Sequence, residues 1–148
     1  TSEDGWTDVL SRLKPKHANA EHFFALQATS PVRSSNDFDK ANTIFIDEKL
    51  DTLFTAEEIR DHYIWDILGE KVTPNNFKYH ERGMRQNLKT RHLENGSFYI
   101  LNRLKFIKNS KRHFGRIGVY EMPKFKSIQI DTFEDAKIAE ALMEKFIR

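Results

Sequence analysis

Apolar positions in the first third of the 148-residue chain switch between helical and strand-like spacing. Residues 3–14 place their apolar side chains on one helical face, which predicts an amphipathic helix. The apolar run at residues 23–26 ends in polar, turn-forming residues, as a buried strand does. Pro31 cannot donate to a strand ladder, so the strand stops before it. Asn36 or Ser35 is then expected to cap a helix whose apolar face spans residues 38–45.

The rest of the chain continues this alternation. Four stretches have the length and apolar content of strands: residues 53–59, 63–68, 97–101 and 117–122. A short helix is expected around residues 103–107, whereas residues 77–94 are polar, basic and poorly periodic, which predicts an extended arm or long loop. A last strand is expected at residues 127–131, before a final helix that Thr132 and Asp135 cap. Because strands alternate with helices, we expect an α/β fold with a mostly parallel sheet flanked by helices.

Composition adds limits to this picture. Apolar residues make up 39% of the chain and there is no cysteine, which fits a globular protein of the reducing cytoplasm and excludes disulfides. No apolar run reaches the roughly 18–20 residues of a membrane span. Charge is uneven: residues 1–70 hold 7 Lys/Arg against 14 Asp/Glu, and residues 71–126 hold 14 against 3. Such a basic stretch attracts phosphates, carboxylates or nucleic acid, or is a solvated face.

Polar residues follow two of the expected strands, where open α/β sheets bind ligands. Residues 27–33 read Gln-Ala-Thr-Ser-Pro-Val-Arg, and Asp131 stands just before a helix. A carboxylate at this place suits a divalent cation such as Mg²⁺, although a helix cap is the commoner role. Arginines such as Arg82 and Arg85 suit carboxylate or phosphate, or belong to a solvated loop. The histidines and glycines form no zinc, dinucleotide or P-loop motif.

Five ordered segments resemble the acylneuraminate cytidylyltransferases. Residues 26–41, Leu-Gln-Ala-Thr-Ser-Pro-Val-Arg with Asp-Phe-Asp-Lys-Ala after it, are similar to that family's LQPTSPLR…DI(D)xA segment. The other four are Arg-Gln-Asn-Leu at 85–88, Glu-Asn-Gly-Ser-Phe-Tyr-Ile at 94–100, Ile-Gly-Val-Tyr-Glu-Met-Pro at 117–123, and Ser-Ile-Gln-Ile-Asp-Thr-Phe-Glu-Asp at 127–135. The resemblance covers essentially the whole chain. It implies a Rossmann-like nucleotidyltransferase fold with a dimerisation arm at about residues 69–95.

The resemblance also implies an activity, in which the anomeric hydroxyl of a nonulosonic acid attacks the α-phosphorus of CTP. The products are a CMP-sugar and pyrophosphate, Mg²⁺ is the expected cofactor, and a cytoplasmic homodimer without nucleic acid or membrane is the expected state. Arg85, on the arm, is expected to be catalytic and to bind sugar carboxylate or phosphate in the partner's site. The remaining expected substrate-binding residues are Gln27, Gln86, Asn95, Tyr99 and Phe114.

Two departures from the family pattern qualify this interpretation. The family's glycine- and lysine-containing phosphate loop has no match, so we expect residues 1–148 to be the C-terminal two-thirds of a cytidylyltransferase domain. Asp131 is expected to be catalytic and to bind the metal together with Gln129, a neutral oxygen ligand that stands where the family's metal motif has its first aspartate. A non-catalytic relative that keeps the sugar-binding and dimer surfaces is therefore the alternative. A nucleic-acid binder is disfavoured because no known module is present. Which nonulosonic acid is used stays open.

Overall fold

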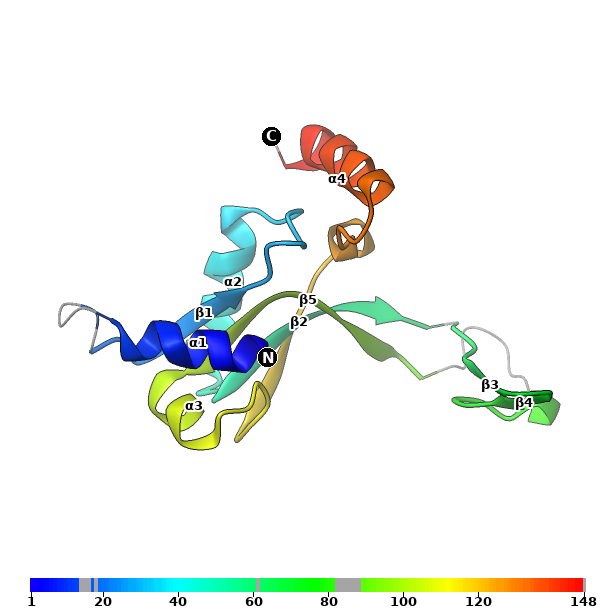
Figure 1. Cartoon of the computed structure of the whole chain (residues 1–148), viewed down its shortest axis with the longest axis horizontal. Coiled ribbons are helices and arrows are strands. Elements are labelled where there is room, and N and C mark those ends of the chain that lie inside the picture. The colour runs from blue at the N-terminus through cyan, green and yellow to red at the C-terminus, as the bar shows by residue number, and fades with distance from the viewer. Residues whose placement is uncertain (14–16, 18, 61, 82–88, 148) are drawn as a thin grey trace.

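The computed structural model describes residues 1–13, 17, 19–60, 62–81 and 89–147. Its elements, in chain order, are α1 (Ser2–Ser11), β1 (His22–Leu26), α2 (Ser35–Asp47), β2 (Thr52–Ile59), β3 (Trp65–Leu68), β4 (Lys71–Pro74), η2 (Tyr79–Glu81), β5 (Arg91–Asn102), α3 (Arg103–Asn109), β6 (Ile117–Glu121), η4 (Lys124–Ser127) and α4 (Phe133–Phe146) (Figure 1). None of the helices in these ranges combines the length and the apolar content that crossing a membrane requires.

The central sheet has four strands in the order β1-β5-β2-β6. The α/β class is therefore confirmed, but the expected parallel pairing is largely wrong. β1, β2 and β6 point the same way, and β5 runs against both of its neighbours, so that only β2 and β6 pair in parallel. The reason is the connection: the described residues between β2 and β5 form the hairpin β3–β4 and the short 3-10 helix η2, and the chain returns antiparallel after this excursion.

The predicted last strand is also wrong. Residues 128–131 belong to no sheet, and Ser127 closes the 3-10 helix η4. Ile128 has an extended backbone, and the segment that it begins lies beside the loop that follows β1. The backbone N–H of Ile130 donates to the carbonyl of Thr29 at 2.8 Å. The alternation of apolar and polar residues therefore does not reveal which part of the chain such a segment lies beside.

The central strand β5 supplies both faces of the core through its alternation. Phe98 and Ile100 pack toward α2, together with Phe45 and Leu53. Tyr99 and Leu101 pack on the opposite face, where α1 and α3 contribute Trp6, Leu10 and Phe106. All four of these β5 residues are at most 2% exposed, as expected for a strand covered on both sides.

Local capping signals fix the helix starts. The Thr132 hydroxyl accepts from the Asp135 N–H at the start of α4, as predicted. At α2 the N-cap is Ser34, one residue before the expected Ser35 or Asn36, and its backbone N–H donates to the Asp37 carboxylate at 2.7 Å. Asp37 also accepts from Lys126 Nζ at 2.6 Å, which fastens η4 to the start of α2.

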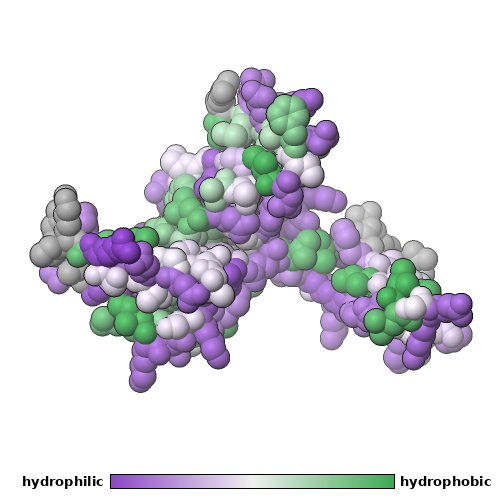
Figure 2. Space-filling model, in the orientation of Figure 1, coloured by the Kyte–Doolittle hydropathy of each residue, from purple (hydrophilic) through white to green (hydrophobic). Residues whose placement is uncertain are grey.

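The hairpin β3–β4 forms a separate two-stranded sheet that projects from the far ends of β2 and β5 (Figure 1). Gly69, with φ +62°, lies in its turn. Several of its apolar side chains face outward, with Ile67 70% and Leu68 76% exposed (Figure 2). This projection lies in the region of the expected arm.

Candidate functional site

The loop after β1 is shaped by a half-buried arginine. Arg33 Nη1 donates to the carbonyl oxygens of Gln27 at 3.0 Å, Ser97 at 2.9 Å and Ser30 at 2.5 Å. Burial lowers the pKa of this guanidinium below its usual range. Because this nitrogen is committed to backbone carbonyls, Arg33 stabilises the loop and leaves Gln27 as the side chain that the loop presents.

A bulge in β5 brings a second amide to the same edge of the sheet. The register against β2 shifts between Phe54 and Ala56, and Gly96 in the inserted stretch has φ +66°. Asn95 is 4% exposed. Its Nδ2 donates to Ser127 Oγ at 3.2 Å, and its Oδ1 accepts from the Ser97 N–H at 3.1 Å. The bulge thus turns a central strand into a rigid bend beside Gln27.

Gln129 completes the group, which we call the amide cluster (Gln27, Asn95 and Gln129). Its Nε2 donates to the Asn95 backbone carbonyl at 2.8 Å, and its Oε1 lies 3.5 Å from Gln27 Nε2. Gln27 Nε2 also donates to Thr29 Oγ1 at 2.9 Å. Three segments far apart in the sequence therefore converge beyond the carboxyl end of β1, where the fold predicts a ligand site.

Asp131 lies two residues from this cluster and is exposed to solvent. Its backbone N–H donates to Asp135 Oδ2 at 3.1 Å. In the described part of the chain, no three His, Asp or Glu side chains are grouped to hold a metal ion. One carboxylate with substrate phosphates can hold Mg²⁺, so Asp131 fits that ion. Gln129 does not fit, because its amide is engaged by Asn95 and Gln27.

Tyr99 and Phe114, both expected to bind substrate, lie instead in the core on the α1 and α3 face. Phe114 is 8% exposed, and its backbone N–H donates to the Thr52 hydroxyl at 3.3 Å. The Tyr99 ring lies 5.8 Å from that of Trp6. Their proposed roles in binding stay predictions, but these positions are those of structural side chains.

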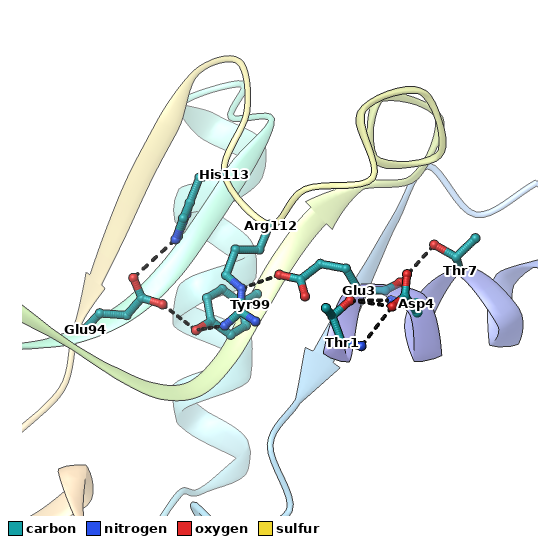
Figure 3. Close-up of polar contacts among 8 residues, drawn as sticks. All are labelled: Thr1, Glu3, Asp4, Thr7, Glu94, Tyr99, Arg112 and His113. Carbon is teal, nitrogen blue, oxygen red and sulfur yellow. Dashed lines mark hydrogen bonds and ion pairs between the residues drawn. The ribbon is translucent and has the colours of Figure 1, made fainter.

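The Tyr99 hydroxyl belongs to a chain of polar contacts that we call the ionic network: Glu3, Arg112, Tyr99, Glu94 and His113 (Figure 3). Tyr99 donates to Glu94, and Arg112 Nη1 donates to the Tyr99 oxygen at 3.2 Å. Arg112 Nε donates to Glu3 at 2.6 Å, while His113 Nε2 lies 3.3 Å from Glu94 Oε2. Burial, then the bond to Glu94, raises the pKa of Tyr99 to about 12. The hydrogen bond to Glu3 raises the pKa of the Arg112 guanidinium above its ordinary value.

Arg85 and Gln86 lie outside the described residues, so their expected roles stay predictions. Three contacts that shape the site escaped sequence analysis: the Arg33 clamp, the donor role of Gln129 and the Arg112 bridge. A basic residue in a loop directly after a buried strand was the one available signal for Arg33. Gln129 and Arg112 contact residues 34 and 109 positions away, which no local pattern encodes.

Comparison with known proteins gives one consistent result. No protein-family model matches the chain. An N-acylneuraminate cytidylyltransferase from Streptococcus agalactiae serotype III (strain NEM316) is 25% identical over 130 residues, which are 86% of this chain and 32% of the relative. N-acylneuraminate cytidylyltransferase B from Danio rerio is 30% identical over 139 residues, or 91% of this chain and 32% of the relative. The chain thus spans about a third of the length of these relatives.

A solved structure agrees at the level of fold. The crystal structure of 4-diphosphocytidyl-2C-methyl-D-erythritol synthase from Anaerococcus prevotii superposes with a TM-score of 0.65 and 15% identity. The match covers 98% of this chain and 65% of that one. The sheet with its flanking helices is therefore a fold that this chain shares with that synthase.

Proposed function

We infer that this chain, which belongs to the acylneuraminate cytidylyltransferase family, supplies the sugar-binding edge of an enzyme that transfers CMP from CTP to a nonulosonic acid of the sialic-acid type. The observation that carries the proposal is the convergence of Gln27, Asn95 and Gln129 at the carboxyl edge of the sheet. Carboxamides both donate and accept hydrogen bonds, which suits the hydroxyl and N-acyl groups of such sugars. The basic residues 71–126 suit two anionic substrates.

In the proposed reaction the anomeric oxygen of the sugar forms a bond to the α-phosphorus of CTP. The bond from that phosphorus to the β-phosphate oxygen breaks, pyrophosphate leaves, and the hydroxyl proton passes to solvent or a base. Asp131, together with the phosphates, would hold Mg²⁺, which would supply neutralisation of the developing charge. The part of this chain is to orient the sugar: Arg33 holds the loop, and Gln27 contacts the bound hydroxyls.

The test uses the full polypeptide that carries this chain, with CTP, Mg²⁺ and a panel of sialic, legionaminic and pseudaminic acids. Pyrophosphate release is expected with at least one acid. Gln27→Ala is expected to lower kcat/KM at least about tenfold, the worth of one hydrogen bond. Asn36→Ala is the control, because Asn36 is an exposed amide on α2. An absence of release with every acid would overturn the proposal.

The alternative function, sugar binding without transfer, is favoured by one observation, the engagement of Gln129 at a metal-ligand position of the family. It predicts that a nonulosonic acid shifts the amide resonances of the cluster while no pyrophosphate appears. The same two measurements therefore separate the transferase from its non-catalytic relative.

We further propose that the β3–β4 hairpin docks on a second copy of the chain, which would bring Arg85 into the partner's site. The outward Ile67 and Leu68 motivate this assignment. Replacing both with Asp should convert a dimer to a monomer in sedimentation velocity without loss of folding. Val9→Asp is the control, since Val9 is 60% exposed on α1. An unchanged sedimentation coefficient would refute the arm as the interface.

A further inference from the structure

We propose that Gln129 is a positioning residue and not a metal ligand: it holds the bend at Asn95 by donating a hydrogen bond to the Asn95 carbonyl, and it holds Gln27 by accepting one from Gln27 Nε2. The inference rests on the proposed function for its meaning, since it concerns the site that would orient the sugar. The contacts of the Gln129 amide, however, do not depend on that function.

The first step is the direction of the Gln129 amide. The Asn95 backbone carbonyl can only accept, and it lies 2.8 Å from Gln129 Nε2. The NH₂ group therefore faces Asn95, and Oε1 is turned toward Gln27 Nε2 at 3.5 Å. A metal ligand would instead have to present its oxygen to an open site. At this place a carboxylate would set one acceptor against another.

The second step is the close packing over Gly96. A Cβ on Gly96 would lie 2.9 Å from Gln27 Oε1 and 3.4 Å from Gln129 Nε2. Both amides thus rest on the one backbone position without a side chain, and Gly96 also needs its φ of +66°. The glycine gives Gln27 and Gln129 the space to lie together.

The third step is the support behind Gln129. Its segment is fastened at three successive points: Ser127 Oγ accepts from Asn95, Gln129 donates to Asn95, and the Ile130 N–H donates to Thr29 at 2.8 Å. Residues 127–130 therefore connect the loop after β1 to the bend in β5 through hydrogen bonds. Within this segment, the Gln129 side chain contacts both the loop, at Gln27, and the bend, at Asn95.

The experiment compares Gln129→Glu, which keeps the length but not the donor, with Gln129→Met, which keeps the volume. Side-chain and backbone amides are followed by NMR with Mg²⁺ alone as the probe, and thermal unfolding is measured in parallel. Both variants should move the Gln27 side-chain resonance and speed exchange of the Ser97 amide about tenfold. Each should leave the unfolding midpoint within a few degrees. Asp131→Asn is the control, because it removes a carboxylate without touching the cluster.

In the unsubstituted protein Mg²⁺ should shift resonances near Asp131 and leave the Gln129 side-chain amide in place. Saturable movement of that amide with Mg²⁺ would overturn the proposal. So would a Gln129→Glu variant that keeps the Gln27 resonance and binds Mg²⁺ more tightly. None of these measurements uses CTP, sugar or turnover, so failure of the proposed function leaves their outcome unaffected. In the pyrophosphate assay Gln129→Met should raise KM for the sugar more than it lowers kcat.

Discussion

Two tyrosines on opposite faces of the sheet each donate a hydrogen bond to a carboxylate that lies near a basic side chain, but the two groups of contacts differ in how deeply they are buried. On the α2 face the Tyr120 hydroxyl donates to Asp37 at 3.3 Å, and Lys126 lies against that carboxylate. On the α1 and α3 face Tyr99 donates to Glu94, and Arg112 donates to Tyr99. Burial is the first cause in both, and both phenols have a pKa of about 12.

The difference lies in where each group of contacts ends. The side chains of Asp37 and Lys126 are 5% and 11% exposed, so that group is closed inside the protein. Burial alone raises the pKa of Asp37, but hydrogen bonds from Lys126 and Ser34 outweigh it and hold the pKa below its usual value. The ionic network reaches solvent, with the side chains of Glu94 and His113 35% and 37% exposed. The first joins α2 to η4, and the second joins α1 to the loop after α3 and extends to the surface.

The largest expected effect comes from breaking the closed group. Lys126→Met leaves Asp37 charged, buried and without its cation, which should cost about 3–5 kcal/mol of unfolding free energy. Urea unfolding at neutral pH measures this loss. Lys124→Met is the matched control, because Lys124 lies in the same 3-10 helix and is exposed. Equal losses in the two variants would contradict the stabilising role of the buried pair of Lys126 and Asp37.

A smaller effect is expected in the ionic network. Arg112→Met removes the donors to Glu3 and Tyr99 and the cation 5.5 Å above the Trp6 ring. The network is partly solvated, so we expect a loss of about 1–3 kcal/mol. The fluorescence of Trp6, read in a Trp65→Phe background, should change with it. Lys111→Met should change neither quantity, and an unmoved Trp6 signal in Arg112→Met would refute the docking role of Arg112.

The smallest effect appears at high pH. Both phenol pKa values rise from 10.0 to about 12 on folding, so the neutral phenol is the form that the fold favours. The stability this gives is complete below pH 10 and is lost as pH rises toward 12. Between about pH 9 and pH 11, Tyr99→Phe and Tyr120→Phe should each reduce the fall in unfolding free energy by about 1 kcal/mol. A fall that neither substitution alters would place the alkaline transition elsewhere.

The elements that sequence analysis predicted well are those whose physics is local. The Thr132 cap, for example, depends on Asp135, which lies three residues away. The direction of β5 was missed because it depends on what joins it to β2. The family resemblance named Gln27, Asn95 and Gln129, but their mutual contacts depend on the bulge in β5. Lys126 and Asp37 meet across 89 positions, and only the packed fold brings them together.

Strand β5 connects the hairpin to the core of the molecule. Its 12 residues run from the base of the hairpin, through the bulge at Asn95, to the buried residues around Ile100. Along the chain, the hairpin lies between β2 and β5. A mechanical force applied to the hairpin is therefore transmitted to the sheet through these two strands. On β5 that force reaches the bend under Gln27 before it reaches the core. Because the bulge interrupts the regular pairing of β5 with β2, we expect pulling on the hairpin to displace the amide cluster before the core.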